Sequence, residues 1–174
     1  MTTPVRDLES HYEHLLTCPE MIDTRDHLPL FRSLTGRILE IGCDVGNSTT
    51  AFLVGESRSV ASIDINHRCG ENFFGVEKWR FIAGDSQQQS TFAQVAEERF
   101  DALYIDGAHD YASVYHDLTV YSPLVKYRDV ILVHDVLAHD NFPGVWKAFR
   151  EFRYPQVLNK YILPGSYGLG VIEL

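Results

Sequence analysis

The sequence predicts an α/β protein whose mostly parallel β-sheet is covered by helices on both faces. Short apolar segments alternate with segments of helical composition, which is typical of parallel strands joined by crossover helices. Four of these apolar segments end in an acidic residue, and right-handed crossovers place such strand ends on one rim of the sheet. The last two apolar segments are separated by the turn Pro164-Gly165-Ser166, which indicates an antiparallel hairpin at the end of the sequence.

The expected elements divide the chain as follows. Residues 1–25 are expected to form an N-terminal helical extension, with a helix at 11–16, that covers an edge or mouth of the sheet. A further helix is expected over 26–34, with His27 at the protein surface rather than, as the alternative, facing the ligand cleft. The expected parallel strands are 37–41, 59–64, 79–85, 100–106 and 129–135, the helices between and after them are 48–54, 86–98, 111–124 and 143–152, and the hairpin strands are 156–163 and 168–174. The length of 174 residues suits one domain over 1–174, without repeats or linkers.

Composition and charge argue against several classes of partner. The net charge of −9 and the pI of about 5.3 provide no overall basic field, so nucleic acid is not an expected partner. The three cysteines are odd in number and lack C-x-x-C spacing, which indicates free thiols in a reducing compartment. No apolar run has the length of a signal peptide or a membrane span. We therefore expect a soluble cytoplasmic protein that does not bind membranes.

The segment 38–50 predicts a ligand site, because it reads as a buried strand, a glycine turn and a helix start. Gly42 and Gly46 carry no side chain, so a ligand can approach the main chain closely. Ser48 and Thr49 are expected to cap the helix that follows. The segment lacks two glycines of the dinucleotide pattern G-x-G-x-x-G, which disfavours a nicotinamide cofactor.

Acidic residues at the next two strand ends suggest contacts to a nucleoside. Asp64 follows Gly42 by about 20 residues, the spacing at which a carboxylate accepts the hydroxyls of a ribose. Asp85 and Ser86 end the third strand, where a carboxylate can accept the amine of an adenine. Either acid could instead cap a helix or turn.

The densest polar cluster lies at the ends of the fourth and fifth strands and comprises Asp106, His109, His134 and Asp135. Two carboxylates this close are unfavourable unless a proton or a cation lies between them. This favours a divalent ion bound by Asp106 and Asp135, with His134 or His109 as a third ligand. The alternatives are a histidine general base without a metal and hydrogen-bonded structural histidines.

These motifs together resemble class I S-adenosylmethionine-dependent methyltransferases, in the branch of the catechol O-methyltransferase, cephalosporin-hydroxylase-like and macrocin O-methyltransferase-like enzymes. The segments that carry the resemblance are E-I-G-C-D-V-G-N-S-T (40–49), I-D (63–64), G-D-S (84–86), Y-I-D-G-A-H-D-Y (104–111), V-H-D (133–135) and F-P-G-V-W-K-A-F (142–149). The resemblance implies a Rossmann-like three-layer α/β/α sandwich with a seven-stranded sheet of order 3-2-1-4-5-7-6, strand 7 being antiparallel.

The resemblance also implies S-adenosylmethionine as cofactor and assigns its contacts. The methionine end is expected at Glu40, Gly42 and the turn through Cys43 and Gly46 to Ser48, the ribose at Asp64 with Ile65, the adenine at Asp85 with Ser86, and the reactive end at Asp106. Asp106, His134 and Asp135 are the expected ligands of a divalent cation, magnesium or manganese. Asp106, His109 and His134 are the candidate catalytic residues.

The expected reaction is methyl transfer to an oxygen of a small polar acceptor such as a sugar or a catechol-like hydroxyl, assisted by a metal ion or a histidine base. The acceptor pocket is expected to be open or completed by a second subunit of a homodimer. Three alternatives remain: a non-catalytic S-adenosylmethionine-binding module, an NAD-dependent oxidoreductase and a metal-dependent hydrolase.

Overall fold

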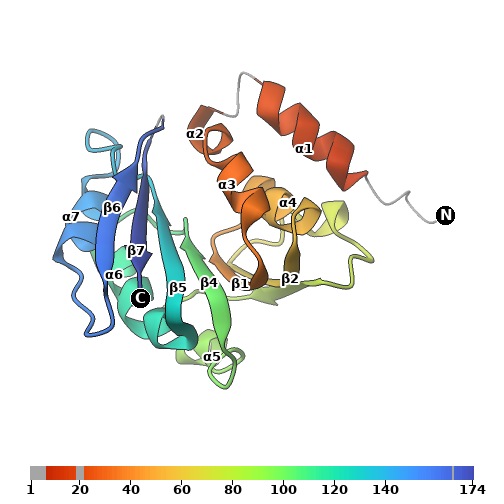
Figure 1. Cartoon of the computed structure of the whole chain (residues 1–174). Coiled ribbons are helices and arrows are strands. Elements are labelled where there is room, and N and C mark those ends of the chain that lie inside the picture. The colour runs from red at the N-terminus through yellow and green to blue at the C-terminus, as the bar shows by residue number, and fades with distance from the viewer. Residues whose placement is uncertain (1–6, 19–21, 166) are drawn as a thin grey trace.

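A computed structural model describes residues 7–18, 22–165 and 167–174, so Ser166 of the expected hairpin turn and positions 1–6 and 19–21 of the expected extension lie outside the described residues. The described residues form a seven-stranded sheet of order β3-β2-β1-β4-β5-β7-β6, which confirms the predicted topology (Figure 1). β7 is antiparallel to both of its neighbours, whereas the other pairs are parallel. The strands are β1 (Gly36–Ile41), β2 (Ser57–Asp64), β3 (Trp79–Ala83), β4 (Phe100–Ile105), β5 (Val125–His134), β6 (Asn159–Leu163) and β7 (Leu169–Glu173).

Helices cover both faces of this sheet, as predicted. Alternate side chains of each strand point to opposite faces, so Leu39 and Ile41 of β1 join one core while Ile38 joins the other. The first core includes side chains of α6 (Tyr111–Tyr121) and α7 (Pro143–Glu151). The second includes side chains of α1, α3 and α4. The remaining helices are α1 (Leu8–Thr17), α2 (Ile22–Arg25), α3 (Leu28–Ser33), α4 (Asn47–Val54), α5 (Gln89–Phe92) and the 3₁₀ helices η1 (Gly70–Asn72) and η2 (Ser122–Leu124).

The helix expected over 86–98 is largely absent: only the four residues of α5 are α-helical there. The segment that follows is closed by short-range bonds instead, such as those from Gln94 N to Thr91 O and from Glu98 N to Val95 O. Only Thr91 and Val95 of this segment are buried. A single short row of buried residues gives a long helix too little core contact to stabilise it.

The N-terminal helix extends the helical layer over one face of the sheet rather than covering an edge. α1 begins at Leu8, directly after its N-cap Asp7, and is longer than the expected 11–16. Tyr12 and Leu15 are buried in the same core as α3 and α4. Among the described residues, no helix combines the length and the apolar character required to cross a membrane.

Candidate functional site

A cavity of about 470 Å³ lies at the carboxyl ends of the central strands. It brings together residues predicted to bind a cofactor and residues predicted to be catalytic. A larger hollow of about 1010 Å³ lies between α7 and β6, but its described lining residues include none of the predicted site residues. The predicted residues that line the smaller cavity are Gly42, Asp64, Ile65, Ser86, Asp106 and His109.

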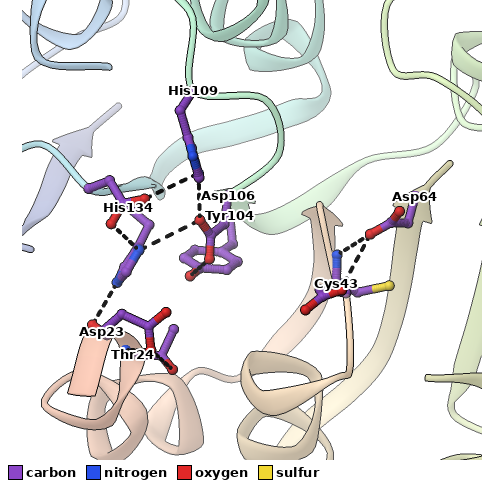
Figure 2. A network of polar contacts seen from close by, with 10 residues as sticks. Asp23, Thr24, Cys43, Asp64, Tyr104, Asp106, His109 and His134 are labelled. Carbon is purple, nitrogen blue, oxygen red and sulfur yellow. Dashed lines mark hydrogen bonds and ion pairs between the residues drawn. The ribbon is translucent and has the colours of Figure 1, made fainter. Parts of the chain in front are cut away.

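The glycine turn is held in place by the Asp64 carboxylate. Asp64 Oδ2 accepts the backbone N–H groups of Cys43 and Asp44, each at 2.9 Å, and Asp64 Oδ1 accepts that of Asn66 at 2.8 Å (Figure 2). Asp44 adopts φ 41°, which is uncommon for a residue with a side chain. Asp64 Oδ2 already accepts two N–H groups, whereas Oδ1 accepts one and retains a further acceptor position, so the ribose contact assigned to Asp64 stays a prediction.

The Glu40 carboxylate lies beneath this turn and does not line the cavity. It is fully buried and accepts the hydroxyls of Ser48 (2.5 Å), Thr49 (2.7 Å) and Ser62 (2.5 Å). Burial raises the pKa of Glu40 to about 7, although these three hydrogen bonds act in the opposite direction. Glu40 therefore supports the turn from below rather than contacting a cavity ligand directly.

The prediction that Ser48 and Thr49 cap α4 is wrong. The N-cap of α4 is Gly46, which adopts φ 91° and has no side chain that could accept a backbone N–H. The two hydroxyls point to Glu40 instead, because a buried carboxylate without donors would be very costly.

Four other predicted cofactor residues also lie away from the cavity lining. Cys43 contributes its backbone to the turn, while its side chain is buried beside Cys69. The Asp85 carboxylate accepts the N–H of Gln87 at 2.9 Å, as a turn-capping acid does. The residues outside the cavity lining are Glu40, Cys43, Gly46, Ser48 and Asp85.

Several lining residues are not among those predicted from the sequence. Asp44, Asn66 and Gly107 each adjoin or nearly adjoin a predicted residue at a strand end, so this spacing could have identified them. Asp23 had no such signal, because it reaches the cavity only through the packing of α2.

The predicted polar cluster is present at the far end of the cavity. His134 Nδ1 lies 3.0 Å from Asp135 Oδ1 and 3.6 Å from Asp106 Oδ1. His109 Nε2 lies 3.1 Å from Asp135 Oδ2 and 3.5 Å from Asp106 Oδ1 (Figure 2). The His134 side chain is 2% exposed and that of His109 is 31% exposed, so His109 is the imidazole that a cavity ligand can reach.

The charges within the cluster stabilise one another. Burial disfavours a charged His134, but Asp106 and Asp135 outweigh this effect and raise the pKa of His134 to about 11. Burial likewise disfavours a charged Asp106, yet His134 and His109 lower the pKa of that carboxyl below its ordinary value. The hydrogen bond to Asp106 raises the pKa of His109 despite burial. A proton on His134 and a divalent cation would thus compete for the same two carboxylates.

The donor set also fits a metal ion. Asp106, His134 and Asp135 each offer one ligand atom within 4.8 Å of the others. Asp135 adopts φ 63°, a strained conformation of the kind found at functional sites. Asp135 Oδ1 is buried and has no hydrogen-bond partner among the described residues, since its approach to His134 lacks hydrogen-bond alignment. His134 Nε2 donates to the Asp23 carbonyl at 3.0 Å, a contact that fixes the ring with Nδ1 toward the carboxylates.

His27 is buried, contrary to the predicted surface position. It is 3% exposed and its ring stands edge-on to that of His134, with 5.8 Å between centroids. Burial and the charge of His134 lower the pKa of His27. No local pattern predicts this burial, because His27 is enclosed by the packing of α3 against distant segments, including Gly165.

Tyr104 is a site residue that the sequence analysis did not identify. Its fully buried hydroxyl donates to Asp106 Oδ2 at 2.8 Å, which leaves Asp106 Oδ1 facing the two histidines. The sequence pattern that could have predicted this contact is the strand period of two, because the side chains of residues 104 and 106 lie on the same face of an extended chain.

Replacement of Tyr104 with phenylalanine should lower the free energy of unfolding by about 1.5–3 kcal/mol, because a charged acceptor loses its donor. Tyr121→Phe is the matched control, since the Tyr121 hydroxyl is donated at the same 2.8 Å to the neutral Ser86 carbonyl. Urea denaturation should show a smaller loss for Tyr121→Phe, about 0.5–1.5 kcal/mol. Equal losses in the two variants would contradict the special role of the Tyr104 contact.

Two glycines of matched backbone conformation allow the glycine turn to be tested. Gly42 (φ 84°) and Gly75 (φ 82°) both adopt left-handed conformations. A Cβ at Gly42 would lie 2.1 Å from the Asp106 carbonyl oxygen, whereas a Cβ at Gly75 would have no described atom within 4 Å.

Gly75→Ala should therefore cost only the backbone strain, about 1–3 kcal/mol, while Gly42→Ala should cost several kcal/mol more or prevent folding. Thermal unfolding monitored by circular dichroism measures both variants. Similar melting temperatures would show that the turn is not packed against β4 as described.

Comparison with known proteins gives one family match and many structural matches. A family model described as a methyltransferase domain matches residues 39–136. No curated protein sequence matches the chain. Among solved structures, a Staphylococcus aureus protein provisionally named a caffeoyl-CoA O-methyltransferase is 20% identical, with a TM-score of 0.73 over 99% of this chain and 93% of that one.

Two further structures were solved for enzymes of natural-product biosynthesis. The MycE methyltransferase of the mycinamycin pathway, in complex with Mg, S-adenosylhomocysteine and mycinamycin VI, is 15% identical with a TM-score of 0.68. That match covers 99% of this chain but only 53% of MycE. CalS11, a TDP-rhamnose 3'-O-methyltransferase of calicheamicin biosynthesis, is 18% identical with a TM-score of 0.61, over 99% of this chain and 96% of CalS11. At these identities the likeness establishes the fold.

Proposed function

Because the chain belongs to the methyltransferase domain family, we propose that it transfers the methyl group of S-adenosylmethionine to a hydroxyl oxygen of a small polar acceptor such as a sugar or a catechol. One observation carries this proposal: a single cavity of about 470 Å³ runs from the glycine turn and Asp64 to Asp106 and His109. The structures of MycE with S-adenosylhomocysteine and of the sugar methyltransferase CalS11 support the donor and the acceptor class.

The donor is proposed to lie along the glycine turn. S-adenosylmethionine supplies an electrophilic methyl group on a sulfonium, so the protein has to bind, align and desolvate the reactants. Asp64 accepts ribose hydroxyls while it holds the turn, and Ile65, which is 70% exposed, offers an apolar surface to the adenine. Ser86 contributes a hydroxyl at the same end of the cavity.

The reaction centre is proposed to lie at Asp106 and His109. His109 takes the proton of the acceptor hydroxyl, because it lines the cavity while His134 is buried. Asp106 and Asp135 orient the His109 ring through their contacts to Nε2.

A divalent cation, magnesium or manganese, is proposed to be held by Asp106, His134 Nδ1 and Asp135. Such a cation would supply Lewis acidity that lowers the pKa of the acceptor hydroxyl. The Asp135 oxygen that accepts no hydrogen bond among the described residues and the orientation of His134 support this assignment, as does the Mg in the MycE structure.

Calorimetric titration with S-adenosylhomocysteine, followed by transfer assays on a panel of sugars and catechols with Mg²⁺, Mn²⁺ or EDTA, tests the proposal. We expect micromolar binding and turnover of at least one hydroxyl compound. Asp64→Ala should weaken binding at least about tenfold, since the turn loses its acceptor. Asp140→Ala, an exposed acid on the loop after β5, is the control and should bind normally.

The alternative functions give different results in the same experiment. Binding of S-adenosylhomocysteine without turnover of any panel compound would favour a non-catalytic binding module. Thermal stabilisation by NAD instead of S-adenosylhomocysteine would overturn the proposal in favour of an oxidoreductase.

A further inference from the structure

Two buried thiols meet directly behind the glycine turn. The Sγ atoms of Cys43 and Cys69 lie 3.5 Å apart, and the two residues are 3% and 0% exposed. Figure 2 shows the Cys43 sulfur pointing away from the cluster of Asp106, His109 and His134. The thiol pair therefore has no part in the reaction proposed above. Cys18, the remaining cysteine, lies at the end of α1 and is partly exposed.

Two further contacts join the segments that carry the thiols. Arg68, next to Cys69, forms an ion pair with Asp44, next to Cys43. The Asn72 amide donates to the Val45 carbonyl at 3.2 Å. The two residues that follow Cys43 thus both contact the segment that carries Cys69.

A third contact lies at the start of α4, where Gly46 packs against the segment after β2. A Cβ built at Gly46 would lie 2.5 Å from the Phe73 ring and 3.0 Å from Cys69 Cβ, so the turn and the segment after β2 are in close contact. The sulfur atoms, now 3.5 Å apart, have to approach by about 1.5 Å to reach the length of a disulfide bond, about 2.0 Å.

We propose that Cys43 and Cys69 are a modification site at which hydrogen peroxide forms a reversible intramolecular disulfide. In the first step a Cys69 thiolate attacks one peroxide oxygen, the O–O bond breaks, and Cys69 becomes a sulfenic acid as the other oxygen leaves as water after protonation. In the second step the Cys43 sulfur attacks the sulfenic sulfur and releases a second water. Two thiols and one hydrogen peroxide thus give one disulfide and two waters.

The environment of the pair favours this division of roles. The hydrogen bond between the thiols lowers the pKa of Cys69 and raises that of Cys43, so Cys69 is the more readily ionised of the two. The oxidant reaches the pair through the exposed segment around it, where Asn66, His67 and Arg68 are exposed and Phe74 is 79% exposed. Local opening of such a segment requires the loss of few buried contacts.

The disulfide would tie the donor-binding turn to the segment that follows Asp64. It closes a loop of roughly 25 residues, which restricts the unfolded chain. We therefore expect the oxidised protein to melt at a temperature roughly 5 °C or more above that of the reduced protein.

The test is treatment of the full chain with hydrogen peroxide, followed by alkylation, intact mass measurement and non-reducing peptide mapping. The expected result is one alkyl adduct, on Cys18, on a chain whose mass is otherwise lower by about 2 Da, together with a crosslinked peptide pair containing Cys43 and Cys69 and reversal by dithiothreitol. Cys18→Ser should behave as the unmodified sequence does, whereas Cys43→Ser and Cys69→Ser should not form the crosslink.

Three results would overturn the proposal. The first is alkylation of both Cys43 and Cys69 when the peroxide-treated protein is denatured. The second is a crosslink that contains Cys18. The third is an oxygen adduct on Cys69 that persists while Cys43 stays reduced. Because mass measurement needs neither donor nor acceptor, these outcomes do not depend on the proposed methyl transfer.

Discussion

Replacement of Asp106 with asparagine is expected to reduce methyl transfer at least about a hundredfold, the largest effect of any single substitution in the cluster. The asparagine keeps the shape of the side chain but removes the charge that faces His109 and His134. It would weaken a cation site and leave the His109 ring less well oriented. Steady-state assays should show the loss in kcat, with KM for the donor changed by less than about tenfold, because the rest of the cavity is intact.

Asp140→Asn is the control for this substitution, since it makes the same chemical change on an exposed loop. It should leave kcat within about twofold of the unmodified protein. Full transfer activity of Asp106→Asn in the presence of EDTA would exclude both the cation and the carboxylate from the mechanism.

The stability of the protein is expected to fall as the pH rises from about 6.5 toward 11. The pKa of His134 is about 11 in the folded protein, against an ordinary value of 6.5. The folded state therefore retains a proton that the unfolded chain releases above pH 6.5. The resulting stabilisation is complete below pH 6.5 and is lost as the pH rises through 11. Urea denaturation in EDTA should show a decrease of at least about 2 kcal/mol between pH 6.5 and pH 10.

Comparison with His134→Gln isolates this effect from other titrating groups. Lys160 changes stability in the opposite sense, because burial lowers its pKa to about 8 and deprotonation then favours the folded state. That contribution is present in both proteins and cancels in the difference between them. The difference should shrink steadily with rising pH, and a constant difference would show that His134 is not held protonated by Asp106 and Asp135.

Most of the fold could be predicted from local patterns in the sequence. Apolar runs of strand length, each ended by a polar turn, located the seven strands to within a few residues, because a buried parallel strand requires continuous apolar sequence. The helix prediction over 86–98 was wrong for the converse reason. Its apolar residues had helical spacing, but spacing alone does not reveal how much of a segment the core will bury.

The site could be predicted from the sequence to about the same degree as the fold. Parallel strand ends must lie on one rim, so the convergence of Asp106, His134 and Asp135 followed from their positions in the strands. The contacts of Glu40 did not follow, since its three hydroxyl donors come from two different elements. Tyr104 was missed because a strand tyrosine is ordinarily read as a core residue.

The sequence by itself determined the sheet, the rim on which the acids gather and the family of the chain, because strand pattern and strand-end chemistry are written in short contiguous segments. Only the tertiary structure decided which acids face the cavity and which histidine is exposed within it. Those properties depend on burial and on donors from distant elements, and a side chain's neighbours across the fold are set by packing rather than by its position in the chain.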